Sequence, residues 1–158
     1  MTPQILATAI IPAALQLLPA ALDSARARLL LVAIAIQESA LRYRQQVGGP
    51  ARGFWQFEQG GGVNGVLTHP ATRPLALAVC ETLVVTPTAG EVYAAIAQND
   101  LLACCVARLL LKADAAALPD IGDRDGAWAY YQRNWRPGKP HPDKWPANYE
   151  AARQALGL

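Results

Sequence analysis

The residues LLLVAIAI (29–36) are followed directly by the polar residues QES (37–39) and indicate a buried central helix. Its eight apolar residues leave no polar face on a helix, and a helix of that kind has to be buried. Asp23 or Ser24 can cap its start, so we predict a helix over about 24–46. The polar residues after the apolar run then lie at the edge of the core.

Most of the remaining chain also reads as helices separated by caps and helix breakers. Alanine and leucine dominate its 158 residues, and a chain of this length fits one compact domain. We therefore predict a mainly α, single domain over residues 1–158. Its other helices are expected over about 3–20, 72–85, 88–98, 100–114, 124–135 and 146–156.

One long segment interrupts this helical pattern, the glycine-rich stretch GGPARGFWQFEQGGG (48–62). Glycine and proline end the preceding helix, and three consecutive glycines close the segment. The four residues FWQF (54–57) can form a short strand or one arm of a β-hairpin. Long loops in compact domains are usually functional. We expect a small irregular lobe over about 48–66.

Composition excludes several classes of protein. Hydrophobic residues make up 53% and charged residues 16% of the chain, which argues against disorder. The net charge of +2 suits an anionic polymer such as a bacterial cell wall, whereas a nucleic-acid binder has a denser basic stripe. Cys80, Cys104 and Cys105 lack ligand spacing and are interpreted as small buried residues. We predict no metal, no cofactor, no nucleic-acid partner and a monomer.

The N-terminal segment 5–22 is almost wholly apolar and allows two interpretations. It lacks the basic start of a secretory signal and contains Pro12, Gln16 and Pro19. We favour a core helix kinked at its prolines over a stable membrane span. The alternative is a weak signal-anchor that delivers the protein to the periplasm.

Glu38 is the main candidate for chemistry. A carboxylate at the edge of an apolar core loses hydration, which raises its pKa and keeps it protonated as a general acid. The alternative is an ordinary ion pair, because Arg42 lies four residues further along the expected helix.

Three motifs together resemble the lysozyme-like superfamily, most closely soluble lytic transglycosylases and goose-type lysozymes. The first is QES (37–39) at the end of a buried helix, and the second is GFWQF (53–57) shortly after it. The third is a helix near the C-terminus, where AYY (129–131) stands in place of the Ala-Tyr-Asn of the family and the usual nearby glycine is missing. The string from Arg52 to Gln56 is also similar to chitinase-like endolysins.

The resemblance implies a peptidoglycan-cleaving enzyme with Glu38 as general acid and base, acting on the bond between N-acetylmuramic acid and N-acetylglucosamine. A lytic transglycosylase needs no second carboxylate, whereas a lysozyme does, and Glu58 is the candidate for that role or a solvated loop acid. The other implied substrate contacts are Ser39, Trp55, Gln56, Tyr130 and Tyr131. A phage origin is also implied, with synthesis in the bacterial host cytoplasm and action in the periplasm, free or on the virion.

Several of these residues have a structural alternative. Gln56 can pin its own loop, and Trp55 can fix the loop to the core. Trp128, Tyr131 and Trp135 share one helix face, for which a core role is the default, while Tyr130 lies on a different face and is expected in the cleft.

Three rival functions stay open at this stage. They are a non-catalytic glycan-binding or virion structural protein on the same fold, a chitinase-like hydrolase, and a nucleic-acid binder that uses the mixed basic and aromatic segment 133–145. For that segment we favour a proline-rich flap over the core.

Overall fold

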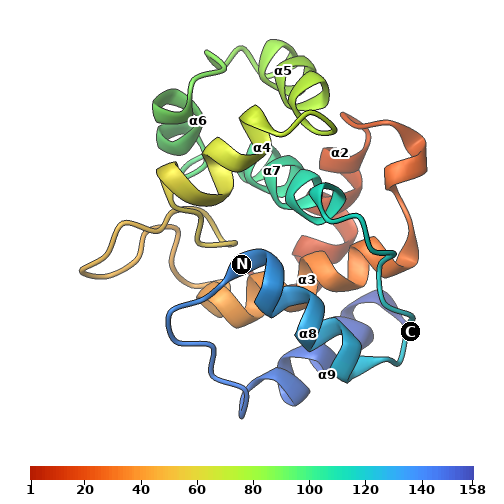
Figure 1. The fold of residues 1–158 in the computed structure, drawn as a ribbon. Coiled ribbons are helices and arrows are strands. Elements are labelled where there is room, and N and C mark those ends of the chain that lie inside the picture. Colours follow the sequence, from red (N-terminus) through yellow and green to blue (C-terminus); the bar gives the residue numbers. More distant parts are fainter.

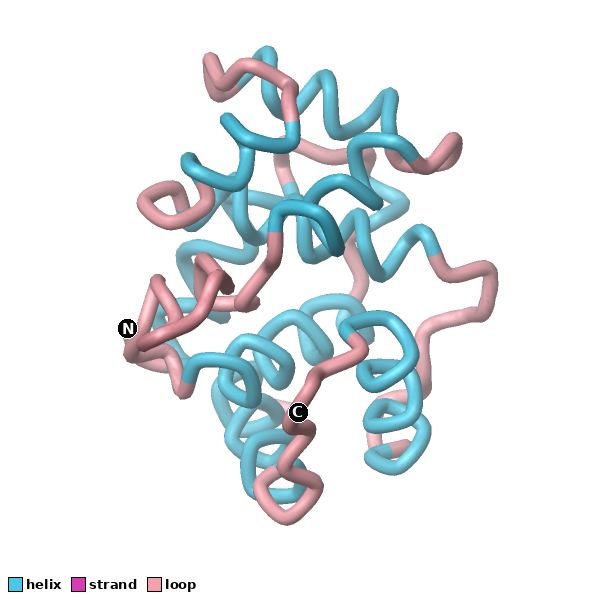
Figure 2. Tube along the Cα trace, turned by 60° about the vertical axis from the view of Figure 1, so that its left-hand side comes forward, coloured by secondary structure: helices cyan, strands magenta, loops and turns pink.

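The computed structural model describes all residues, 1–158, and is mainly helical, as predicted (Figure 1). No strand forms, and the helices are joined by loops (Figure 2). In chain order the elements are α1 (Pro3–Ile5), η1 (Leu6–Ile10), α2 (Ile11–Leu15), η2 (Ala20–Leu22), α3 (Ala25–Ser39), η3 (Gln59–Val63), α4 (Asn64–Thr68), α5 (Arg73–Thr82), α6 (Ala89–Ala95), α7 (Asp100–Ala113), α8 (Arg124–Trp135) and α9 (Trp145–Leu156).

Helix α3 occupies the middle of the molecule, as its sequence requires. It packs most extensively on α9 and also contacts α7 and α8, while α4 and α5 pack on α7 away from α9 (Figure 1). Every residue from Leu29 to Ala35 is buried. Ser24 caps the helix, because its hydroxyl accepts a hydrogen bond of 3.2 Å from the backbone N–H of Ala27.

Helix α3 ends at Ser39, seven residues before the predicted end near residue 46. Ala40 and Leu41 both take left-handed backbone conformations, with φ of 49° and 55°, which stop the helix without a glycine. The Ser39 hydroxyl donates to the carbonyl of Ala35 and accepts from the N–H of Leu41, which fixes this turn. Arg42 is therefore outside the helix, and no ion pair between it and Glu38 exists.

The N-terminal segment is part of the core, as predicted. α1, η1 and α2 follow one another without a break, and Leu6, Ile11 and Ala14 are fully buried. The thiol of Cys105 on α7 donates to the carbonyl of Ala14. The helical run stops at Leu15, earlier than the expected residue 20. No helix has the length and apolar character needed to cross a membrane.

The irregular lobe is partly what the sequence predicts. Residues 42–58 form a loop whose only ladder contacts are two isolated antiparallel bridges, Gln45 with Arg52 and Arg52 with Phe57, so the β-hairpin is not formed. The triple glycine lies in η3, which runs on into α4, but its backbone is irregular as expected, because Gly61 has non-helical angles (φ −92°, ψ −108°). A side chain at Gly62 would lie within 3 Å of the Phe57 ring, so glycine is what allows this close approach.

Trp55 fixes the lobe to the centre of the fold. Its side chain is fully buried, and its indole N–H donates a 3.0 Å hydrogen bond to the carbonyl of Leu31 in α3. Gly53 begins this turn with φ of +71°, a conformation that favours glycine. The lobe is thus attached to α3 by a buried aromatic side chain.

We expect Trp55→Ala to lower the free energy of unfolding by about 3–5 kcal/mol, since a large buried ring and its hydrogen bond are lost. Urea denaturation followed by circular dichroism measures this change. Val47→Ala is the matched control, because Val47 lies in the same loop but is 83% exposed, and it should shift stability by less than about 0.5 kcal/mol. Equal effects of the two substitutions would contradict the assigned role of Trp55.

Candidate active site around Glu38

Glu38 lies in the last turn of α3, where the buried run meets the surface. Its carboxyl group is partly buried. The hydroxyl of Tyr131, on α8, donates a 2.6 Å hydrogen bond to Oε1 of Glu38. This is the only protein hydrogen bond that the carboxyl makes, and no cation pairs with it. Oε2 is therefore left for the acidic proton and for a ligand.

The surroundings of Glu38 favour its protonated form. Burial raises its pKa from the usual 4.5 to about 7, and the hydrogen bond from Tyr131, which favours the charged form, offsets only part of this rise. The other carboxyl groups with a resolved shift, Asp23 and Asp114, have lowered pKa values. Among the carboxyl groups with a resolved shift, Glu38 has the raised pKa that a proton donor near neutral pH requires.

An aromatic cluster holds Tyr131 in place. Its ring stacks on Trp145 of α9 with centroids 5.4 Å apart and planes 7° from parallel, and it also packs on Trp128 and Trp135. Burial raises the pKa of the Tyr131 hydroxyl, and the neighbouring Glu38 carboxylate raises it further. The phenol consequently stays protonated and acts as a hydrogen-bond donor.

Trp135 connects this cluster to the irregular lobe. Its indole N–H donates a 3.0 Å hydrogen bond to the carbonyl of Trp55, and its ring packs on Phe57 with centroids 5.6 Å apart. The GFWQF motif and the aromatic helix α8 are therefore in direct contact. The structure brings the motif regions at 37–39, 53–57 and 129–131 to one end of α3.

Gln37 adds a contact that sequence reasoning missed. Its side-chain NH₂ donates to the carbonyls of Pro140 (2.7 Å) and His141 (3.1 Å). Asn148, on α9, donates a 2.7 Å hydrogen bond to the Gln37 side-chain carbonyl. These contacts hold the segment 136–144 against the end of α3, which agrees with the flap interpretation. No local pattern reveals a partner more than a hundred residues away, although the position next to Glu38 was a hint.

Both tyrosines are buried, and Tyr131 rather than Tyr130 contacts Glu38. Tyr130, expected in the cleft, is 1% exposed, and its hydroxyl donates to the carbonyl of Leu111 (2.8 Å). Tyr131, assigned by periodicity to a core face, is the residue that reaches Glu38. The expectation for Tyr130 is wrong because α8 directs that ring toward the end of α7. Tyr131 is both a core residue and a site residue.

The remaining predicted substrate contacts serve mainly the architecture. Ser39 is buried and occupied by the turn that ends α3, and Trp55 has no exposed surface. Gln56 is half-buried, and its NH₂ donates to the carbonyls of Gly53 (2.7 Å) and Tyr43 (3.3 Å), so it pins its own loop. The side-chain carbonyl of Gln56 makes no protein hydrogen bond and remains available to a ligand.

Glu58 makes no direct contact with Glu38. It is exposed at the start of η3 and makes no side-chain hydrogen bond or ion pair. No group of three or more His, Cys, Asp or Glu side chains could hold a metal ion. The site therefore consists of one acid, its phenol donor and the aromatic cluster behind them.

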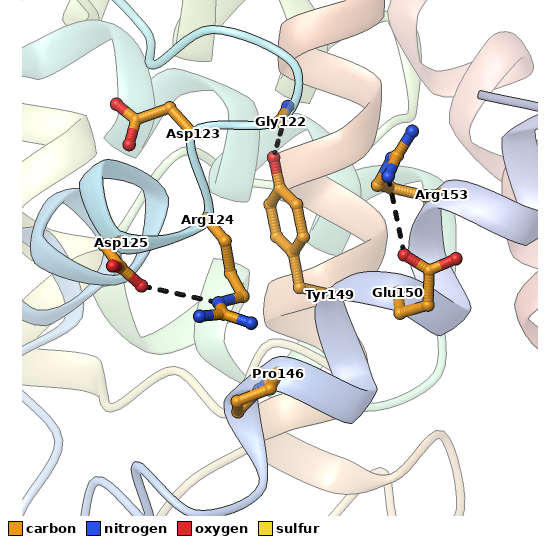
Figure 3. Close-up of a pocket in the computed structure, with 8 residues that line it drawn as sticks. All are labelled: Gly122, Asp123, Arg124, Asp125, Pro146, Tyr149, Glu150 and Arg153. Atoms are coloured by element: carbon orange, nitrogen blue, oxygen red, sulfur yellow. Dashed lines mark hydrogen bonds and ion pairs between the residues drawn. The ribbon is translucent and has the colours of Figure 1, made fainter.

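A surface hollow near the C-terminal helices is a separate feature. It measures about 440 Å³ and lies between the starts of α8 and α9, with Tyr149 at its centre (Figure 3). Its walls are the exposed pairs Arg124–Asp125 and Arg153–Glu150. Glu38 is not among its lining residues. Trp145 packs on both Tyr149 of the hollow and Tyr131 of the Glu38 site.

Comparisons with known proteins add no relative. No protein-family model matches the chain, and no curated protein or solved structure is significantly similar to it. What the chain does has to be inferred from its own residues.

We expect the raised pKa of Glu38 to make stability fall as pH rises. Between the unfolded pKa of 4.5 and the folded pKa of about 7 the native state holds the extra proton, so the stabilisation present below pH 4.5 is lost by about pH 8. Glu38→Gln keeps an acceptor for Tyr131 but cannot ionise. It should exceed the wild type in unfolding free energy by about 1–3 kcal/mol at pH 8 and match it at pH 4. The same difference in unfolding free energy between Glu38→Gln and the wild type at pH 4 and at pH 8 would contradict the raised pKa.

Tyr131→Phe should raise the pKa of Glu38 above about 7, because it removes the one hydrogen bond that favours the carboxylate. Carboxyl carbon chemical shifts followed by NMR across pH measure the change. Tyr130→Phe is the matched control, since it also deletes a buried hydroxyl but one bonded to Leu111, and the Glu38 titration should stay in place.

Proposed function

We propose that this protein cleaves the glycan strands of bacterial peptidoglycan, with Glu38 as general acid and then base. The observation that carries the proposal is the Glu38 carboxyl group, with its pKa raised to about 7 by burial and its Oε2 unpartnered. A general acid works best when its pKa is near the working pH, and glycosidases use a carboxyl group raised in this way.

The arrangement of the motifs supports the same activity. In the family that the sequence resembles, the acid ends a buried helix and the G-x-x-Q segment follows it. Here Trp55, inside GFWQF, donates to Leu31 of the helix that carries Glu38. The third motif supplies Tyr131, which stands where the family has asparagine and donates to the acid. An asparagine amide and a phenol are both hydrogen-bond donors, so the replacement preserves that capacity.

The proposed reaction begins with proton transfer. Glu38 Oε2 gives its proton to the glycosidic oxygen as the bond from that oxygen to the anomeric carbon breaks, and positive charge develops on the sugar. The 6-hydroxyl of the same muramic acid then forms a bond to the anomeric carbon and returns its proton to the Glu38 carboxylate. The product is a 1,6-anhydro sugar, and the enzyme ends in its starting protonation state.

The single raised carboxyl group favours this intramolecular route over hydrolysis. Hydrolysis needs a second carboxylate to activate water or stabilise the charged sugar. Glu58, the sequence candidate, is exposed, and no hydrogen bond or ion pair holds its carboxylate in a fixed position. We assign to Tyr131 the task of orienting that group, because a stacked and buried ring fixes the position of its hydroxyl.

A wall substrate also defines where the protein would act. We propose that it is made in a bacterial cytoplasm, as a phage-encoded protein, and reaches peptidoglycan in the periplasm, free or on a virion. The apolar segment 5–22 is folded into the core through Leu6, Ile11 and Leu15, so a signal-anchor role would require the domain to release it. We therefore favour delivery that does not depend on that segment.

Glu38→Gln should reduce the release of soluble fragments from purified peptidoglycan by at least about 100-fold, because general acid catalysis contributes that much or more. Wild-type activity should fall as pH rises through about 7, where the acid loses its proton. Glu81→Gln, an exposed acid on α5, is the matched control and should keep full activity. Equal activity of the Glu38 and Glu81 variants would refute the assignment.

Mass spectrometry of the released fragments separates the two cleavage routes. We expect products one water lighter than hydrolysis products, and Glu58→Gln should release them at the wild-type rate. Hydrated products together with an inactive Glu58 variant would instead indicate a lysozyme. If the protein cleaves chitin oligomers but leaves peptidoglycan uncut, the chitinase-like alternative is indicated. Glycan binding without release of any fragment would indicate a non-catalytic protein.

A further inference from the structure

The segment 136–144 carries an unbalanced positive charge. Arg136, Lys139 and Lys144 are exposed, against one acidic residue, Asp143, in the same segment. None of these four forms an ion pair. Elsewhere most exposed arginines form ion pairs with aspartates. Examples are Arg26 with Asp120, Arg44 with Asp100 and Arg133 with Asp114. The cations of this segment are thus free to meet a ligand.

The position of the segment is fixed beside the acid. Gln37, the neighbour of Glu38, holds the carbonyls of Pro140 and His141, which lie between Lys139 and Lys144 in the chain. Asn148 holds Gln37 from α9. The chain also enters the segment from α8, which carries Tyr131 at the site. Two helices and the end of α3 therefore hold the backbone of this segment against the residue next to Glu38.

The proposed substrate carries negative charges that complement the positive charges of segment 136–144. Peptidoglycan strands bear carboxylates on their lactyl-linked peptides, next to each muramic acid, whereas chitin strands are neutral. A cation beside the acid attracts those carboxylates, and the effect weakens with salt because the groups are exposed.

We propose that the segment 136–144 is a subsite for the carboxylates of the peptide-substituted strand, and that Gln37 is the positioning residue that fixes it beside Glu38. This inference rests on the proposed function and gives it a specificity determinant. Lys139 and Lys144 select an anionic strand over a neutral one, and Arg136 adds to their field. Gln37 acts on the substrate through the segment and has no chemical step of its own.

Binding of the inactive Glu38→Gln protein to insoluble peptidoglycan tests the subsite without requiring cleavage. Lys139→Gln/Lys144→Gln in that background should weaken sedimentation with the wall about tenfold at low salt, and the difference should shrink at high salt. Arg73→Gln/Lys112→Gln removes the same charge from α5 and α7 and should leave binding nearly unchanged. Equal weakening by both double variants, or none by either, would overturn the subsite.

Activity assays separate the subsite from the proposed function. With the active enzyme, Lys139→Gln/Lys144→Gln should raise KM for peptidoglycan about tenfold and leave kcat nearly constant. If the wild type releases no fragments, the cleavage proposal fails while the sedimentation result still decides the subsite. An unchanged KM with a lowered kcat would contradict a binding role for these lysines.

Gln37→Leu tests the positioning role with all cations retained. Trypsin cuts poorly before proline, so the bonds after Arg136 and Lys139 are protected and the bond after Lys144 reports on the segment. Gln37→Leu should speed that cut and weaken wall binding, whereas Gln154→Leu, on the exposed side of α9, should do neither. Unchanged cleavage and binding in Gln37→Leu would overturn the role of Gln37.

Discussion

The burial of the apolar run 29–35 in α3 is the constraint on which the rest of the structure depends. This run has no face that tolerates water, so α7, α8, α9 and the N-terminal helices enclose it. The first ionisable side chain after the run, Glu38, is consequently taken partly out of water at the point where the helix ends. The same burial that stabilises the fold raises the pKa of this carboxyl group, and stability and proposed chemistry share one cause.

The aromatic cluster makes that arrangement specific. A carboxyl group at a core edge without a partner is free to choose among rotamers, whereas Tyr131 orients this one through Oε1. The tyrosine is itself held between rings of Trp145, Trp128 and Trp135. Oε2, which has no protein partner, belongs to a carboxyl group held in one orientation through Oε1, and such preorganisation is what a positioned acid requires.

The sequence predicted those features whose causes are local. Apolar runs and caps predicted the helices, and the run before Glu38 predicted a carboxyl group with a raised pKa. Features that depend on distant partners were missed or misplaced. Helix α3 stops at Ser39 because Ala40 and Leu41 adopt left-handed backbone conformations, which alanine and leucine rarely do. The choice between Tyr130 and Tyr131 depends on how α8 is rotated against α3 and α7, and the Gln37 contacts depend on α9 and the preceding segment.

Trp55 has a consequence for how the molecule opens. Its indole N–H donates to α3, and its backbone carbonyl accepts from Trp135 of α8, so one residue joins the lobe, the central helix and the aromatic helix. A loop attached by surface contacts can unfold alone at little cost, but this lobe leaves its place only if the core opens with it. The lobe and the acid therefore belong to one cooperative unit, and the geometry around Glu38 persists for as long as the whole domain stays folded.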